Sequence, residues 1–522
     1  MNHATTVSKK PAVKHCVFLF AMLAIYLVAY FAHPALPGNN PDYPMGWWGW
    51  FDQGEYLKAA KAIAARDFST ENYYYPPLYT LLGAAFVWVN PMHAFTILNT
   101  VCFLIFAHYF VLTAMRIVGW GLATFIFTFT VLFSQHILQI WVEPWTSSLV
   151  SALFAFLIAK VDEISREGAT VSRTQLATWS IIGGAIFLTR PADAVTISPL
   201  FCFVLWQVWH ANKNPKTPES STAIAFQKTS ALLVPGLLGV ALFASFNFFV
   251  HGSIGGRYFA MAETNGFHLT DLLEKVISIL LDAGTLYNVP QESILQKAKW
   301  LAALIPAAIF FLFKGNASIR LILTLILTQV IIYFPYADLL PTGVWKYHNI
   351  HYFKWIFPYA GLLIVAWAKA IPIRPPIQAG GGVWLASLAL GIFFLSMQFK
   401  LDIVAQNDVK ASLVEATDGP ILLISAGKTL SVDKVSVPQL GGDFQAIYFS
   451  TNARVQAGDK ELHYVRDYRF LPSKDGVDLL FIRPVKTDLI KIYPGDMRLS
   501  MVSTPPTWFS NRLVLGVPAW LR

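Results

Sequence analysis

The run Ala94–Met115 reads AFTILNTVCFLIFAHYFVLTAM and contains no Asp, Glu, Lys or Arg. A helix of this length is long enough to cross a hydrocarbon core of roughly 30 Å. Similar apolar runs recur along the first four hundred positions of a chain of 522 residues. The sequence therefore predicts an all-α polytopic membrane bundle.

The composition agrees with this class of protein. Hydrophobic residues make up 55% of the chain and charged residues 13%, whereas soluble domains carry about 25% charged residues. The net charge of +9 lies largely in loops between apolar runs, where the positive-inside rule accounts for it, so no nucleic-acid partner is expected. The three cysteines show no disulfide or metal-ligand spacing.

About eleven transmembrane helices are predicted from the apolar runs. They are expected at 17–36, 94–115, 118–138, 145–161, 176–190, 194–209, 231–250, 299–313, 320–337, 352–370 and 382–399. With these spans, the basic loops share one side with the N-terminal lysines, which places the N-terminus in the cytoplasm of an inner (plasma) membrane protein. A cleaved signal peptide is the alternative for the first run. The stretch Pro76–Asn90 is then a re-entrant or interfacial helix.

A second domain is expected after residue 400. Residues 1–400 form the predicted transmembrane domain, and residues 401–522 form a small exported α/β or β-rich domain. Short β-like runs support this boundary, because they alternate with Gly, Asp and Asn turns. They include PILLISA, QAIYFST and DLLFIRP.

Two acids stand out in the predicted outside loops. A helix is expected over Gln53–Arg66, with Asp52 at its start and Glu55 three residues on. Asp52 is either the N-cap of this helix, with Glu55 as its capping-box partner, or a general base at a cavity mouth. Glu143 precedes Pro144 at a helix start, where it is either a solvated boundary residue or a functional acid.

Cations also concentrate on the predicted outside, against the positive-inside pattern. Arg190 ends one span, where pairing with Asp193 or snorkelling is the structural interpretation. The others lie at the outer ends of later spans, and they indicate a bound anion such as phosphate or, alternatively, lipid headgroup contacts. They are His251, Arg257, Lys346, His348, His351 and Lys354. A divalent metal is left open as a cofactor.

An ordered set of motifs covering about residues 17–370 resembles the GT-C superfamily of membrane glycosyltransferases, especially lipid A aminoarabinose transferases and protein O-mannosyltransferases. The motifs are DQGEY, YYYPPLY, VEPW, LTRP and HYFKWIFP. The chain departs from the family pattern at Gln53, which replaces a second acid, and at Tyr75, which replaces a Lys before Pro76. No WWDYG motif occurs, which argues against an oligosaccharyltransferase.

The resemblance implies transfer of a sugar from a polyprenyl-phosphate donor to an acceptor hydroxyl of a lipid, glycan or protein on the exported face. Asp52 is the expected base, and Glu143 either orients the acceptor or shares the proton. The remaining expected substrate-binding residues are Glu55, Tyr56, Tyr75, Arg190, Arg257, His348, His351 and Lys354. Displacement from one face would invert the anomeric centre.

Two non-enzymatic classes remain as alternatives. A multi-pass transporter of a lipid or solute predicts ionisable residues near the middle of spans. His108 is the main interior candidate, although it could simply bond a neighbouring helix. A structural protein whose exported tail carries the function is the other alternative.

Overall fold

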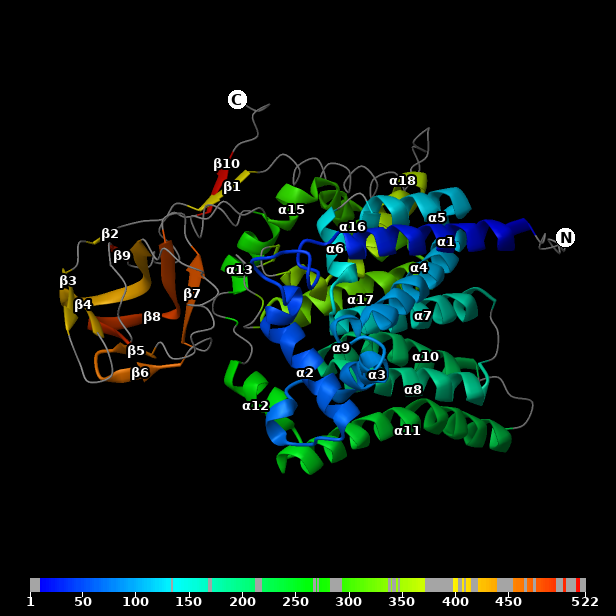
Figure 1. Cartoon of the computed structure of the whole chain (residues 1–522). Helices are drawn as coiled ribbons and strands as arrows, with labels where there is room; N and C mark the ends of the chain where they lie inside the picture. Colours follow the sequence, from blue (N-terminus) through cyan, green and yellow to red (C-terminus); the bar gives the residue numbers. More distant parts are fainter. Residues whose placement is uncertain are drawn as a thin grey trace. The chain divides into compact units, whose positions relative to one another are not determined.

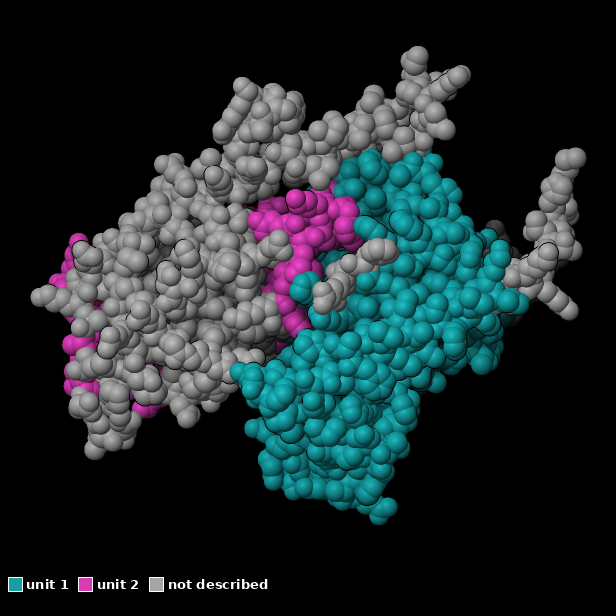
Figure 2. Space-filling model, turned by 45° about the horizontal axis from the view of Figure 1, so that its top comes forward, with its two compact units in different colours: residues 1–260, 303–332, 350–388 teal, residues 261–302, 333–349, 389–522 magenta. Residues whose placement is uncertain are grey.

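The computed structural model describes residues 10–132, 135–167, 171–211, 218–265, 269, 272–281, 293–336, 339, 344–345, 348–370, 398–401, 406–407, 410–414, 421–438, 454–463, 467–472, 476–493, 501–503 and 513–516. Contacts divide the chain into two compact units, coloured separately in Figure 2. The first unit comprises residues 1–260, 303–332 and 350–388, and the second comprises residues 261–302, 333–349 and 389–522.

The first unit is helical. Its longer helices α1, α4, α7, α8, α10 and α11 run side by side along a common direction (Figure 1). The helices are α1 Lys10–Phe31, α2 Phe51–Ala65, α3 Pro77–Val87, α4 Thr96–Val118, α5 Trp120–Phe127, α6 Gln135–Val142, α7 Thr146–Glu167, α8 Arg173–Thr189, α9 Pro191–Thr196, α10 Ser198–Ala211, α11 Pro218–His251, α12 Gly256–Asn265, α16 Leu304–Lys314, α17 Ala317–Tyr333 and α18 Ile356–Ala370. The second half of α12 belongs by contacts to the second unit.

Several of these helices are apolar, as expected for a membrane protein. Within the described residues, four helices are long and apolar enough to cross a membrane, or five if the pair Trp120–Leu132 and His136–Val142 is one span bent by 85°. Helices occupy ten of the predicted spans, but the count of eleven spans is not confirmed. The last predicted span lies mostly outside the described residues, and Gln398 and Phe399 at its end begin a strand.

Glycines let two helices of the first unit approach closely. A Cβ atom added at Gly239 of α11 would lie 2.5 Å from the Cα atom of Gly184 of α8. The backbone N–H of Gly236 donates a hydrogen bond to Ser180 Oγ at 2.6 Å across the same contact. Small residues at helix contacts in membranes permit this kind of backbone packing.

The second unit is rich in β-structure, which confirms the expected β-rich C-terminal part. It also holds the helices α13 Leu272–Leu280 and α15 Ile294–Lys297. The strands are β1 Gln398–Leu401, β2 Gln406–Asn407, β3 Lys410–Val414, β4 Ile421–Pro438, β5 Arg454–Ala457, β6 Lys460–Leu462, β7 Tyr468–Pro472, β8 Gly476–Tyr493, β9 Met501–Ser503 and β10 Leu513–Gly516.

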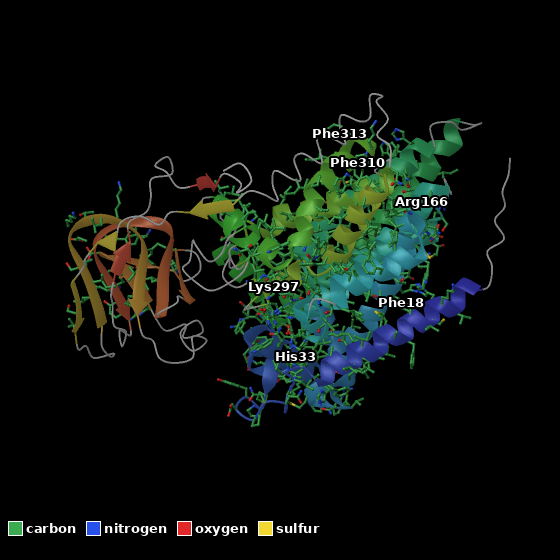
Figure 3. The ribbon with its side chains drawn as sticks, turned by 90° about the horizontal axis from the view of Figure 1, so that it is seen from above. Phe18, His33, Arg166, Lys297, Phe310 and Phe313 are labelled. Carbon is green, nitrogen blue, oxygen red and sulfur yellow. The ribbon has the colours of Figure 1, made fainter. Side chains whose placement is uncertain are left out.

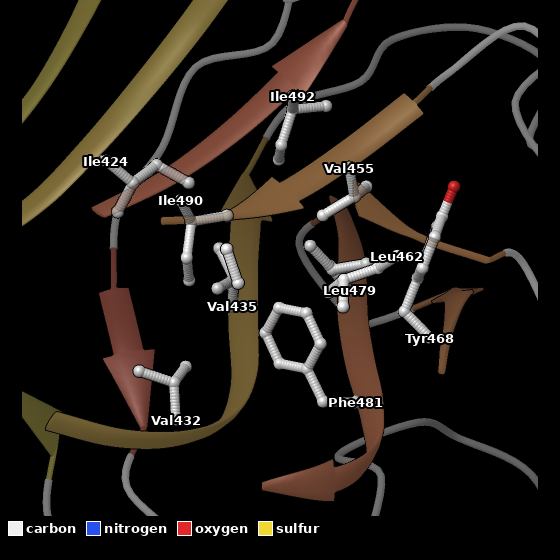
Figure 4. Packing of buried hydrophobic residues seen from close by; sticks show 11 residues of the cluster. Ile424, Val432, Val435, Val455, Leu462, Tyr468, Leu479, Phe481, Ile490 and Ile492 are labelled. Atoms are coloured by element: carbon white, nitrogen blue, oxygen red, sulfur yellow. The ribbon is translucent and has the colours of Figure 1, made fainter. Parts of the chain in front are cut away.

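The long strands β4 and β8 pair antiparallel at the centre of an eight-stranded sheet with the order β2-β9-β4-β8-β5-β6. Strand β3 pairs with β4 and β7 with β8, whereas β1 and β10 form a separate two-stranded sheet. A buried cluster that includes Val435, Leu479 and Phe481 forms the core of the large sheet (Figure 4). The predicted runs PILLISA and DLLFIRP fall on β4 and β8, while QAIYFST lies outside the described residues.

Candidate functional site

Asp52 lies in the first turn of α2, close to its predicted place, but it does not cap the helix. The N-cap is Trp50, which makes no side-chain capping bond. The Asp52 carboxylate instead accepts a hydrogen bond from the Tyr75 hydroxyl. The capping interpretation of Asp52 and Glu55 is therefore wrong, because the carboxylate is directed to a partner 23 positions along the chain. Asp52 remains half-buried.

Tyrosines connect Asp52 to the helix that begins at Thr146. The rings of Tyr56 and Tyr75 lie 4.8 Å apart. Burial is the main cause that raises the pKa of both phenols well above the ordinary value, and the nearby Asp52 carboxylate is the second cause. At Tyr56, a hydrogen bond with Thr146 and the charge of Arg190 oppose this rise. Both phenols therefore stay protonated and able to donate hydrogen bonds at any working pH.

Glu143 lies in the turn between α6 and α7 and is completely buried, with 0% of its surface exposed. His33 follows α1 (Figure 3), and its Nε2 atom lies 3.1 Å from Glu143 Oε1. Trp145 Nε1 donates a hydrogen bond to Glu143 Oε2 at 2.8 Å. The expectation of a solvated boundary acid is wrong, because each carboxylate oxygen contacts a buried side chain.

Arg190 and His351 come together although they are 161 positions apart. Arg190 Nε pairs with Asp193 Oδ2 at 2.9 Å, so the predicted ion pair is present. Arg190 Nη1 lies 3.5 Å from His351 Nδ1, and its guanidinium lies 4.7 Å from the centre of the Tyr352 ring. His351 stacks on Trp145 with 3.9 Å between ring centroids.

Lys354 lies in the turn before α18 and is completely buried. Its ammonium donates to Ser148 Oγ at 2.6 Å and to the Ile140 carbonyl at 3.4 Å, and it lies 4.6 Å from the centre of the Trp141 ring. Within the described residues, the ion pairs of the helical unit do not include Lys354. The hydrogen bonds of this amine therefore go to neutral groups, while the buried Glu143 carboxylate acts on it electrostatically.

The other predicted residues occupy different surroundings. Arg257 is exposed at the start of α12, 5.9 Å above the Tyr74 ring. Glu55 lies half-buried on α2, one turn from Asp52. His348 belongs to the second unit, and its backbone is left-handed with φ 57°. Lys346 lies outside the described residues.

The structure brings together a set of residues that we call the polar cluster: Asp52, Tyr56, Tyr75, Thr146, Ser147, Ser148, Arg190, His351 and Lys354. Ser147 Oγ lies 3.2 Å from His351 Nδ1 and continues the contacts from α7 to the turn before α18. Sequence reasoning missed His33, Trp145 and the hydroxyl run Thr146–Ser148. The sequence marks the hydroxyl run only by its composition, since three hydroxyl residues follow Glu143, Pro144 and Trp145 without interruption.

The interior histidine is explained by packing. His15 Nε2 of α1 lies 2.7 Å from His108 Nδ1 of α4. His108 therefore bonds a neighbouring helix, which was the structural alternative to a role in transport. Across the described part of the chain, no three His, Cys, Asp or Glu side chains are grouped so that they could hold a metal ion.

No protein-family model and no curated protein matches the chain. Among solved structures, it is similar to a crystal structure of ArnT from Cupriavidus metallidurans bound to undecaprenyl phosphate, with a TM-score of 0.45 and 14% sequence identity. The match covers 74% of this chain and 64% of that chain, which is less than two thirds of its length. Similarity at this level assigns neither an activity nor a site to the chain.

Proposed function

We propose that the protein is a multi-pass glycosyltransferase of the GT-C type in an inner (plasma) membrane. It moves a sugar from a polyprenyl-phosphate donor to the hydroxyl of a lipid, glycan or protein acceptor on the exported face, with inversion. The ordered sequence motifs and the polar cluster support this proposal together, because the motif residues Asp52, Arg190, His351 and Lys354 belong to one connected set of contacts.

The observation that carries the proposal is the surroundings of Lys354. A buried charge is costly unless it is paired. Among the described residues, the direct contacts of this amine are a hydroxyl, a carbonyl and an aromatic face, and the Glu143 carboxylate acts on it electrostatically. Arg190 and His351 add positive or proton-donating groups nearby. A phosphate entering the cluster would add a negative charge in direct contact with these groups, and charged donors arranged in advance stabilise a phosphate leaving group.

Asp52 is the base in this mechanism. Its carboxylate is half-buried at the start of α2 and accepts a hydrogen bond from Tyr75. The acceptor oxygen attacks the anomeric carbon, and its proton passes to Asp52. The bond from that carbon to the phosphate oxygen breaks, and the phosphate leaves with the electron pair toward Lys354 and Arg190.

Glu143 has a different part in this scheme. Both of its oxygens are engaged by buried side chains, so its contacts favour positioning of Trp145 over direct contact with the acceptor. Trp145 in turn stacks on His351. Glu143 is therefore proposed as a positioning residue that acts through two aromatic rings.

Donor binding is the direct test. Purified protein in nanodiscs should bind undecaprenyl phosphate more tightly than undecaprenol, and Lys354→Met should reduce this preference at least tenfold. Lys61→Met, an exposed lysine on α2, is the matched control and should bind as wild type does. Equal binding of the phosphate and the alcohol, or an unchanged preference in Lys354→Met, would reject the proposed clamp.

Transfer itself is tested with labelled undecaprenyl-phosphate sugars and total membrane acceptors. Wild-type protein should release undecaprenyl phosphate and move the label to an acceptor. Binding of the lipid phosphate without any transfer, across pentose and hexose donors, would instead favour a lipid transporter.

A further inference from the structure

A second group of cations lies near the C-terminal ends of α4, α7 and α18, the last two of which begin at or just after residues of the polar cluster. Together they line a cavity of about 320 Å³ within the first unit. Arg116 comes from α4, Arg166 from α7 and Lys369 from α18, and the remaining wall includes Phe311 and Ile319. This volume falls in the range of ligand-binding clefts, which is roughly 300–1,000 Å³.

Helix geometry separates this cavity from the polar cluster. About 20 residues of α7 lie between Thr146 and Arg166, which corresponds to roughly 30 Å of helix, and Ile356 and Lys369 of α18 are about 20 Å apart by the same measure. His33 and Arg166 lie toward opposite ends of the helices (Figure 3). The cavity therefore lies about 20–30 Å along these helices from the candidate site.

The arginines are held in place by one buried carboxylate. Asp162, with a side chain only 1% exposed, accepts from Arg116 Nη1 at 3.3 Å and from Arg166 Nε at 2.7 Å. Glu163 pairs with Lys160 at 3.1 Å and with Arg116 Nη2 at 3.5 Å. Three cations, Arg116, Arg166 and Lys369, line the cavity. Together with Lys160 they outnumber Asp162 and Glu163 by two charges.

Helix capping explains only part of this arrangement. Lys369 Nζ donates to the Val118 carbonyl at 3.1 Å, at the C-terminal end of α4, where a cation is favourable. Arg166 Nη1 contacts the Arg116 carbonyl at 3.4 Å in the same region. An ammonium has three donors and a guanidinium has five, so both side chains keep donors beyond those that the caps require. Capping also does not call for an open cavity between the helices.

We propose that this cavity binds the phosphate group of an anionic lipid at the membrane face opposite the candidate site. Guanidinium groups match phosphate oxygens in geometry and charge, and basic pockets between transmembrane helices bind such headgroups. Phe311 and Ile319 provide an apolar wall beside the cations. The same chemistry would accept a free phosphate, and the experiment separates these two sources. The proposal does not depend on the enzymatic activity.

Lys369→Gln is the sharpest variant, because the amide can still donate to the Val118 carbonyl while the charge is lost. Arg166→Gln is a second variant that removes a charge from another helix. Lys314→Gln is the matched control, since Lys314 is exposed at the C-terminal end of α16 and does not line the cavity. Thermal unfolding in detergent establishes that each variant is folded.

Retained lipid is measured by native mass spectrometry after exchange from vesicles of phosphatidylglycerol and phosphatidylcholine. Wild type and Lys314→Gln should retain phosphatidylglycerol selectively, and each cavity variant should retain about fivefold less, as expected for one basic residue near a charged lipid surface. No selective retention by wild type, or an equal loss in Lys314→Gln, would overturn the lipid site. Thermal stabilisation by inorganic phosphate, lost in Lys369→Gln and without lipid retention, would overturn the lipid as ligand and assign the cavity to a soluble phosphate.

Discussion

Asp52 and Glu143 were both expected to serve as acids of one external site, but their surroundings differ in almost every respect. Asp52 is half-buried in the first turn of α2, with Tyr75 as a hydrogen-bond donor. Glu143 is completely buried between α6 and α7, with His33 and Trp145 on its two oxygens. Both lie within the first unit.

From this contrast we expect the two carboxylates to have different functions. In the proposed function, the half-buried acid exchanges a proton with a substrate, whereas the acid enclosed by its partners stabilises a fixed geometry. Replacing the two carboxylates should therefore have different effects. Replacement of Asp52 should mainly lower the reaction rate, and replacement of Glu143 should mainly lower the stability of the fold.

The largest effect is expected for Asp52→Asn. The amide cannot accept the proton of the acceptor hydroxyl, so kcat for sugar transfer should fall by about 10²–10⁴-fold, which is the usual contribution of a positioned base. Glu71→Gln, an exposed acid in the loop after α2, is the control and should retain the wild-type rate. A near-normal kcat in Asp52→Asn would remove Asp52 from the base role.

Glu143→Ala should mainly lower stability. Removing the carboxylate leaves His33 Nε2 and Trp145 Nε1 without their buried partner, at a cost of roughly 3 kcal/mol. Asp52→Ala should cost less than about 1 kcal/mol, because its site is half-buried. Unfolding midpoints of the purified variants in one detergent measure both effects, and a midpoint for Glu143→Ala equal to that of wild type would contradict the contrast.

Trp145→Phe tests how the effect of Glu143 is transmitted. Phenylalanine can preserve part of the stacking on His351 but cannot donate to Glu143, so a loss of about 1–2 kcal/mol in unfolding free energy is expected. Combined with Glu143→Ala, the two losses should not add, because both variants remove the same hydrogen bond. Additive losses would show that the two residues act independently.

The smallest effect is expected for Tyr75→Phe. The raised pKa of Tyr75 keeps the phenol protonated, so it donates to Asp52 throughout the working pH range. Removing a donor from a carboxylate disfavours its charged form, and the acid limb of the pH–rate profile should move to higher pH. Stability should change by about 1 kcal/mol or less. An unmoved acid limb would argue that Asp52 does not titrate during the reaction.

Some structural features follow directly from local patterns. The helix expected over Gln53–Arg66 is present as α2, Phe51–Ala65, because the apolar residues repeat with helical period. Strands β4 and β8 were visible as apolar runs between turn residues. The ion pair of Arg190 with Asp193 was also predictable, since the two residues are three positions apart in the sequence.

Other features depend on segments that are distant in the chain. The partner of Asp52 is 23 positions away, and the contact of Arg190 with His351 spans 161 positions. Glu143 looked like a solvated acid because it is a lone acid at a predicted membrane boundary. Its burial comes from His33, which follows α1 and belongs to a segment more than a hundred residues earlier.

The amino-acid sequence by itself determined that this is an apolar helical protein with a β-rich C-terminal part, because hydrophobicity and its period are properties of consecutive residues. Only the tertiary structure decided which acid is enclosed, which lysine is hydrogen-bonded to neutral groups and which cations gather around a cavity. The physical reason is that desolvation and pairing depend on the groups brought near a side chain from elsewhere in the chain, and no local pattern specifies them.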